Sequence, residues 1–129
     1  MTELLQNGLL KNNTSVELGR EAETFAANML IEHGLHLIEK NVNFRVGELD
    51  LVMKDKDSLV FVEVKRRNSN KFGGAIGSIT AVKQKRLTKA ALAYLQRKKL
   101  MDKVPCRFDL VAVTDTNGLL EAQWIKNIF

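Results

Sequence analysis

A chain of 129 residues is long enough to bury one hydrophobic core without disulfides, and it is short for two domains. Its 45% hydrophobic and 27% charged residues are typical of a globular protein, and no apolar stretch approaches the roughly 18 residues that cross a membrane. The single cysteine excludes an internal disulfide and the start of the chain lacks a secretory signal, so we expect one cytoplasmic domain over residues 1–129, with a flexible segment at 1–13.

The first predicted element is an amphipathic helix at residues 16–33. Thr14 or Ser15 suits the helix N-cap, and Gly34 follows where a C-terminal glycine is expected. Glu23 lies beside the apolar stripe, where it either leans toward a functional site or is an ordinary solvated carboxylate. The stripe itself consists of Ala22, Phe25, Ala26, Met29 and Leu30.

Three strands are predicted next, at residues 35–45, 49–54 and 59–65. Gly47 turns the chain between the first two, and residues 55–57 form a three-residue hairpin turn before the third. Because side chains alternate along a strand, Glu63 and Lys65 share one face of the third strand. Both faces of this strand are apolar over most of its length, as in a central strand.

The remaining elements are a loop at residues 66–79, a helix at 81–98 and two strands at 107–114 and 119–125. The order is therefore αβββαββ. Asp109 lies in the first of these last strands, where it either supports the basic loop or faces water. Cys106 is expected to be a small core residue.

Acidic and basic side chains interrupt strands that are otherwise apolar. Asp50 is expected to lie across from Glu63 and Lys65, because a short hairpin makes their strands neighbours. An unpaired ionised group in such a strand costs on the order of several kcal/mol. These groups are therefore either paired as a structural salt bridge or used to bind a metal, and the pattern alone leaves both open. The arrangement Asp…Glu-x-Lys is one that metal-dependent nucleases use.

Positive charge is concentrated in one part of the chain. Residues 65–103 contain 12 Lys or Arg and one acid, a charge of +11, whereas the remainder contains 8 basic and 14 acidic residues, a charge of −6. Clustered Lys and Arg favour nucleic acid as the partner, because they neutralise phosphates. An acidic membrane surface is the weaker alternative, since the basic helix has no exposed Trp or Phe on its apolar side. A merely solvated basic helix is the third.

The motifs together resemble the YraN-like proteins, small bacterial proteins predicted to be endonucleases distantly related to archaeal Holliday-junction resolvases. The resemblance extends from Leu18 to about Val113. Two positions depart from the family pattern: no proline precedes Asp50, as is often so in this family, and Ala22 replaces the usual glycine. The matching motifs are Leu18-Gly19-Arg20 with Glu23, Gly47-Glu48-Leu49-Asp50-Leu51-Val52, Leu59-Val60-Phe61-Val62-Glu63-Val64-Lys65, Phe72-Gly73, Thr80 with Lys83, and Arg107-Phe108-Asp109-Leu110-Val111.

This resemblance implies a restriction-endonuclease-like α/β fold, with a mixed central β-sheet flanked by helices, and a PD-(D/E)xK-type active site. Asp50, Glu63 and the carbonyl of Val64 would hold Mg²⁺ or Mn²⁺. Glu23 would complete the acidic cluster directly or through a water. Lys65 would orient or deprotonate the attacking water and offset charge on the scissile phosphate.

The residues around this site are assigned to the substrate. Glu48 faces the same way as Asp50, and it either supports the metal ligands or caps the turn. Lys83 or Gln84 would approach the scissile phosphate, as the corresponding helix does in similar nucleases. Contacts of this kind position the backbone and do not read bases, so we expect recognition of branched or single-stranded DNA. The predicted nucleic-acid contacts are Arg66, Arg67, Lys71, Lys83, Gln84, Lys85, Arg86 and Lys89.

Three classes of function remain open from the sequence. The first is a Mg²⁺-dependent endonuclease acting on DNA. The second is a nucleic-acid-binding module with this fold and little or no activity, working with a protein partner in DNA processing. The third is an interaction protein with an accidental basic face. Related resolvases act as dimers, so a homodimer is expected by analogy alone.

Overall fold

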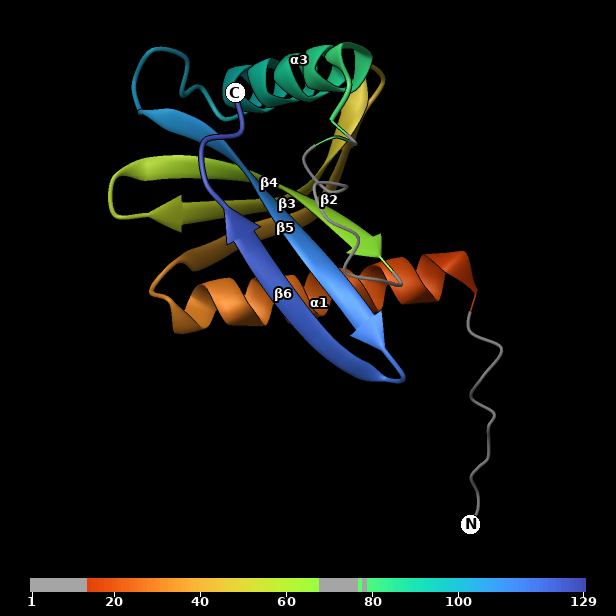
Figure 1. Ribbon diagram of the computed structural model, residues 1–129. Coiled ribbons are helices and arrows are strands. Elements are labelled where there is room, and N and C mark those ends of the chain that lie inside the picture. The colour runs from red at the N-terminus through yellow and green to blue at the C-terminus, as the bar shows by residue number, and fades with distance from the viewer. Residues whose placement is uncertain (1–13, 68–76, 78) are drawn as a thin grey trace.

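The computed structural model describes residues 14–67, 77 and 79–129. Neither helix in these ranges combines the length and hydropathy needed to cross a lipid bilayer. The elements follow the predicted order αβββαββ (Figure 1). They are α1 (Ser15–Glu32), β2 (His36–Phe44), β3 (Gly47–Asp55), β4 (Ser58–Arg67), α3 (Ala81–Arg97), β5 (Cys106–Thr116) and β6 (Leu119–Ile125).

The strands form one mixed sheet in the order β2-β3-β4-β5-β6. β4 pairs with β5 in parallel, and the other three pairs are antiparallel. The parallel connection requires a crossover, which α3 supplies. β4 is therefore the central strand, as predicted, and this mixed α/β fold is consistent with a nuclease-like fold.

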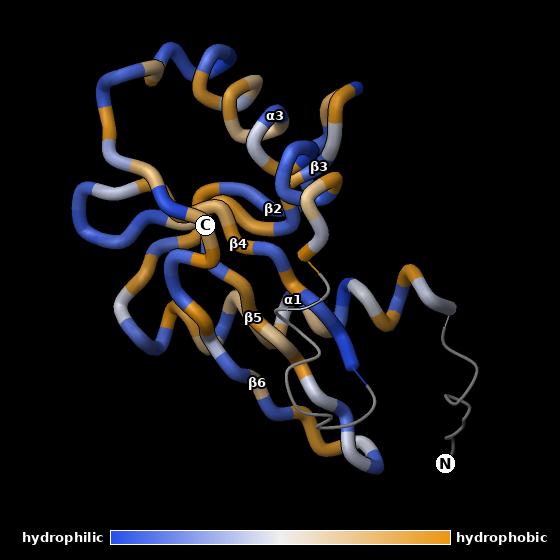
Figure 2. Tube along the Cα trace, turned by 45° about the horizontal axis from the view of Figure 1, so that its top comes forward, coloured by the Kyte–Doolittle hydropathy of each residue, from blue (hydrophilic) through white to orange (hydrophobic). Residues whose placement is uncertain are grey.

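Each helix covers one face of the sheet and builds a separate core (Figure 1). Alternation along β4 divides its side chains between these layers: Val60 and Val62 pack with α1, whereas Leu59 and Phe61 pack with α3. Figure 2 shows hydrophobic segments along the strands between the helices, with β4 becoming hydrophilic toward its C-terminal end. The two-sided burial stops where the acidic and basic residues begin.

Local sequence signals explain the ends of the elements. Thr14 caps α1 through a capping box, in which its side chain accepts the Glu17 N–H and its own N–H donates to Glu17. Gly34 follows α1 with a φ of 98°, a conformation that glycine adopts without strain. Asn117 and Gly118, both with positive φ, form the turn between β5 and β6.

Three predictions of local detail are wrong. The β3–β4 turn contains two residues, because Asp55 already pairs with Ser58. Cys106 is exposed at the start of β5 and is not a core residue. Asp109 is completely buried, so the alternative in which it faces water is wrong. Most of the basic loop, which it was otherwise expected to support, lies outside the described residues.

Asp109 is instead the centre of a structural network. Its carboxylate accepts hydrogen bonds from Arg107 Nε, from Trp124 Nε1 at 2.9 Å and from the Asn127 N–H at 3.0 Å. Arg107 also forms an ion pair with Asp55 at 2.9 Å. These hydrogen bonds offset the cost of burying the carboxylate, and they tie β6 and the C-terminal segment to β5.

Candidate active site

The site begins where β3 separates from β4. Main-chain pairing between the two strands runs from Asp55 with Ser58 to Leu51 with Val62. One residue further, Asp50 Oδ2 accepts a hydrogen bond from the Val64 N–H at 2.9 Å. The carboxylate thus takes the place of a main-chain acceptor, and it is held against β4 between Glu63 and Lys65. This arrangement agrees with the predicted position of Asp50.

Two acids meet at this point without full compensation of their charge. Burial raises the pKa of Asp50 to about 8, and the negative charge of Glu63 adds to the effect, although the Val64 N–H opposes it. The Glu63 side chain is only 11% exposed. Because two neighbouring carboxylates cannot both ionise cheaply in a buried place, the pair favours either a proton or a cation.

Lys83 supplies the positive charge that contacts Glu63. Its Nζ lies 3.2 Å from Glu63 Oε2, and it comes from the first turn of α3. Thr80 fixes this turn, since its side chain accepts the Lys83 N–H at 3.2 Å and its carbonyl accepts the Gln84 N–H. The sequence assigned Lys83 to nucleic acid and missed this ion pair, which alternation along a strand cannot reveal.

An open pocket of about 480 Å³ lies over the two carboxylates. The β2–β3 turn approaches α3 closely here: a Cβ on Gly47 would lie 3.1 Å from the Arg86 carbonyl oxygen. Glycine at this position therefore lets α3 sit directly over the acids. The pocket is lined by Asn43, Gly47, Glu48, Asp50, Glu63, Lys83, Arg86 and Leu87.

Glu23 approaches the acidic pair from α1. Burial raises its pKa, and its negative charge contributes to the raised pKa of Asp50. Its Oε1 is buried without a hydrogen-bond partner in the described part of the chain. However, no three His, Cys, Asp or Glu side chains among the described residues converge closely enough to hold one ion. Glu23 is thus near the pair without joining it.

The chemistry of the donors fits a hard divalent cation. Asp50 and Glu63 offer carboxylate oxygens to the same small region, and Glu23 carries an orphaned oxygen nearby. Mg²⁺ and Mn²⁺ prefer such oxygen ligands, and Mg²⁺ usually keeps several waters and uses only one or two protein carboxylates. Two carboxylates therefore suffice. The predicted part of the Val64 carbonyl as a ligand stays a prediction.

Lys65 is half-buried near the end of β4, two residues after Glu63. In the described ranges, no ion pair joins it to Asp50 or Glu63. The structural salt bridge that the sequence left open for Lys65 is therefore not formed there. Glu48 is exposed at the pocket rim. The chemical roles of Lys65 and Glu48 stay predictions.

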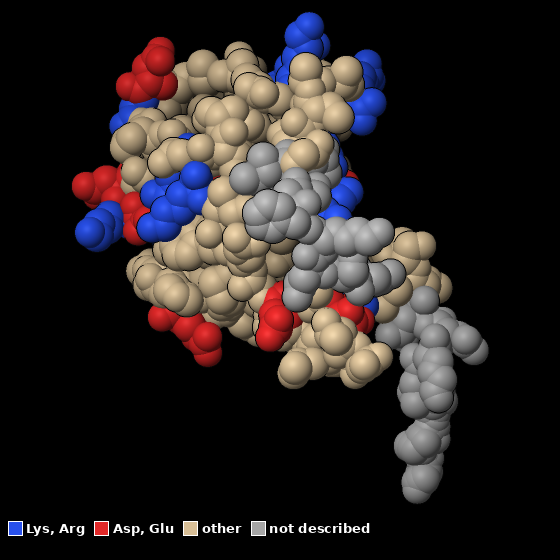
Figure 3. All heavy atoms as spheres, viewed as in Figure 1, with Lys and Arg blue, Asp and Glu red and all other residues tan. Residues whose placement is uncertain are grey.

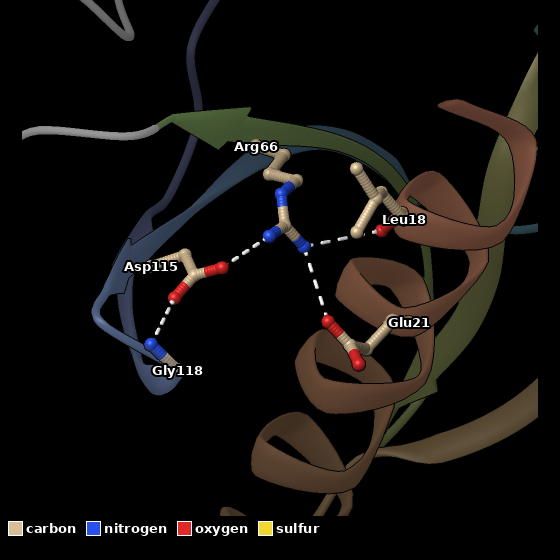
Figure 4. Close-up of polar contacts among 5 residues, drawn as sticks. All are labelled: Leu18, Glu21, Arg66, Asp115 and Gly118. Atoms are coloured by element: carbon tan, nitrogen blue, oxygen red, sulfur yellow. Dashed lines mark hydrogen bonds and ion pairs between the residues drawn. The ribbon is translucent and has the colours of Figure 1, made fainter. Parts of the chain in front are cut away.

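Arg66 makes internal contacts (Figure 4). Its guanidinium pairs with Asp115 in β5 and with Glu21 of α1 at 3.2 Å, and it donates to the Leu18 carbonyl at 3.4 Å. Asp115 also accepts the Gly118 N–H at 2.9 Å. The Arg66 side chain is 17% exposed. These contacts satisfy its charge within the protein, so we leave Arg66 out of the phosphate-binding surface proposed below.

The other predicted nucleic-acid contacts in the described residues lie on α3 and at the end of β4. Gln84, Lys85, Arg86 and Lys89 are exposed on α3, and Arg67 is half-buried at the end of β4. Lys71 lies outside the described residues. On the face shown in Figure 3, basic side chains stand out near the beginning of α3 and also around the β3–β4 turn at the left, and acidic ones lie around α1, β6 and that turn.

A sequence profile of the uncharacterised protein family UPF0102 matches residues 22–113, which include both strands of the site and α3. The chain belongs to this family. The resemblance to the YraN-like proteins is thereby confirmed.

Relatives in UPF0102 match over most of their length. A UPF0102 protein of Nitrosococcus oceani is 43% identical over 120 residues, covering 93% of this chain and 97% of the relative. One of Stutzerimonas stutzeri is 47% identical, with 86% and 92% covered. One of Shewanella oneidensis is 46% identical, with 87% and 98% covered.

Proposed function

We propose that this UPF0102 protein is a metal-dependent endonuclease that hydrolyses DNA phosphodiester bonds, with a preference for branched or single-stranded DNA. The observation that supports it most directly is the meeting of Asp50 and Glu63 where β3 leaves β4, beside a pocket lined by basic residues of α3. Oxygen donors for a cation and positive charge for a phosphate are what phosphoryl transfer requires.

In this proposal Asp50 and Glu63 hold Mg²⁺ or Mn²⁺. The bound ion supplies Lewis-acid polarisation of a phosphoryl oxygen. Lys65 either orients the attacking water and offsets the negative charge of the transition state with its own positive charge, or takes the proton of that water. Hydrolysis forms a bond from the water oxygen to phosphorus and breaks the bond to the leaving oxygen, and the proton released by the water reaches the leaving oxygen through solvent. Arg86 positions the substrate backbone at the pocket.

The alternative is a nucleic-acid-binding module with little or no activity. It is favoured by the ion pair between Lys83 and Glu63, which already neutralises one acid without a metal, and by the failure of Glu23 to join the acidic pair in the described structure. Basic residues on α3 would serve either function. Catalysis is the property that separates them.

Cleavage assays with matched variants test the proposal. Purified protein is incubated with single-stranded, flapped and four-way DNA in Mg²⁺ or Mn²⁺. We expect cleavage that falls on the order of 100-fold or more in Asp50→Asn and in Lys65→Ala, while salt-dependent binding persists. Asp57→Asn, an exposed carboxylate in the β3–β4 turn, is the control and should cleave normally.

Two outcomes contradict the nuclease proposal. Wild-type protein that cleaves none of these DNAs with either ion, yet binds them, supports the binding module. Cleavage that survives in Asp50→Asn at the wild-type rate points to a contaminating nuclease or to a different site.

A further inference from the structure

The ion pair between Lys83 and Glu63 occupies a position that the proposed cation needs. Lys83 Nζ is 3.2 Å from Glu63 Oε2, and both side chains line the pocket that also contains Asp50. An ammonium group and a divalent cation on the same carboxylate repel each other, and the low dielectric of a partly buried place strengthens that repulsion. The two positive charges therefore compete for Glu63.

The Lys83 side chain is also able to move away from Glu63. Its side chain is 34% exposed, against 11% for Glu63, and its long stem starts from the first turn of α3. A flexible ammonium at a pocket mouth exchanges partners at low cost, because water replaces part of the lost contact. The carboxylate, by contrast, stays on the central strand.

Two features of the pocket favour phosphate as the second partner of Lys83. The amino end of α3 carries the partial positive charge of the helix dipole close to the pocket. Arg86 lines the same pocket. A phosphate group entering there would meet positive charge from both sources.

We propose that Lys83 is an exchangeable counter-ion: it neutralises Glu63 when no divalent cation is present, yields to the cation, and then contacts a phosphate of the nucleic acid. This inference rests on the proposed function, because that function supplies the two ligands. The exchange of partners by Lys83 makes cation binding and phosphate binding cooperative. By linkage, each ligand must raise the affinity for the other by the same factor.

The first test measures Mn²⁺ affinity directly, from the free Mn²⁺ signal in electron paramagnetic resonance, without nucleic acid. Lys83→Met removes the competitor and should bind Mn²⁺ about three- to fivefold more tightly, the effect of one partly exposed ion pair. Lys83→Arg restores a positive charge and should remain within about twofold of wild type.

Arg86→Met is the matched control for general electrostatics. Arg86 is one turn further along α3 and lines the same pocket, but no ion pair joins it to Glu63 within the described residues. Its loss should tighten Mn²⁺ binding less than about 1.5-fold. An equal effect of Arg86→Met and Lys83→Met would overturn the inference, as would unchanged Mn²⁺ affinity in Lys83→Met or undetectable binding in every variant.

The second test measures cooperativity with a short single-stranded oligonucleotide by fluorescence anisotropy. Ca²⁺ serves as the cation, since it shares the preference for oxygen ligands. It should tighten oligonucleotide binding several-fold in wild type and in Arg86→Met, and this gain should be clearly smaller in Lys83→Met, where only the direct attraction between cation and phosphate is left. A gain in Lys83→Met as large as in wild type contradicts the exchange.

These tests are independent of cleavage. A protein without nuclease activity still supports the exchange if Lys83→Met binds Mn²⁺ more tightly and shows a smaller Ca²⁺-dependent gain than wild type. Conversely, a protein that cleaves DNA through Asp50 still contradicts it if Lys83→Met behaves like Arg86→Met. The failure of one proposal is thus distinguishable from the failure of the other.

Discussion

At the scale of single residues, Asp50 lies in an environment that disfavours its ionised carboxylate. Its carboxylate is held by one main-chain N–H, is partly buried and faces the negative charge of Glu63. A residue chosen for stability alone would not combine burial with a like charge. Such positions are typical of binding and catalytic sites, which accept a local loss of stability for function.

The raised pKa of Asp50 predicts an unusual dependence of stability on pH. It rises from 3.8 to about 8 on folding, so between these values the folded protein binds a proton that the unfolded chain releases. The contribution of Asp50 to the free energy of unfolding is therefore present below pH 4 and is lost progressively as the pH rises toward 8. In the presence of a chelator, we expect urea denaturation to give a lower free energy of unfolding at pH 8.5 than at pH 5.5.

Asp50→Asn isolates that contribution. The amide keeps an oxygen that accepts the Val64 N–H and removes the charge. At pH 8.5 without divalent cations, the variant should be more stable than wild type by at least about 1 kcal/mol, since each pKa unit corresponds to about 1.4 kcal/mol. Asp57→Asn in the exposed turn should change nothing. A less stable Asp50→Asn would mean that the carboxylate is already compensated in the folded protein.

At the scale of elements, the sequence predicts where strands lie and which side chains share a face better than it predicts how deeply a side chain is buried. Alternation along β4 correctly predicted that Glu63 and Val62 lie on opposite faces, because side-chain direction in a strand is a local property. Which helix covers which face is known only from the structure, with Glu63 on the α3 side and Val62 on the α1 side. It could not show that Asp109 is buried among Arg107 and Trp124, which are brought together by pairing between strands. Nor could it reveal the partner of Lys83, which depends on where α3 lies over the sheet.

Arg66 joins three elements at the end of β4. Its guanidinium connects this strand to α1 through Glu21 and to the β5–β6 hairpin through Asp115 (Figure 4). Arg66→Met keeps the aliphatic volume and leaves both carboxylates without this partner. We expect the free energy of unfolding to fall by about 2 kcal/mol, because removing one member of a partly buried ion pair leaves the others uncompensated.

Arg67→Met provides the comparison for that variant. Arg67 is the next residue of β4, so its side chain points to the other face of the strand. Denaturant unfolding should show a loss of less than about 0.5 kcal/mol. If both variants lose the same stability, the contacts of Arg66 with α1 and the hairpin contribute little, and general loss of positive charge explains the effect.

At the scale of the whole molecule, the charge asymmetry of the sequence is only partly converted into a binding surface. The fold turns Arg66 inward and pairs Lys83 with Glu63, so without a divalent cation both of these positive charges are already neutralised. Lys85 and Lys89 remain exposed, one helical turn apart on α3. The net charge of the segment therefore overstates the number of phosphates that it can contact, which a count along the chain cannot correct.

The salt dependence of DNA binding measures how many cations engage phosphates. For duplex DNA, each neutralised phosphate contributes about 0.9 to the slope of log affinity against log salt. Lys85→Ala and Lys89→Ala should each weaken binding similarly for all sequences and reduce the slope by about 1. Arg66→Met should leave the slope unchanged, because its charge is directed into the protein. So should Lys56→Ala in the β3–β4 turn, because β3 begins at the pocket and ends at this turn. A reduction of the slope for Lys56→Ala equal to that for Lys85→Ala would show that DNA does not favour the α3 side. The proposal that the phosphate backbone binds at the pocket between α3 and the two acids would then be contradicted.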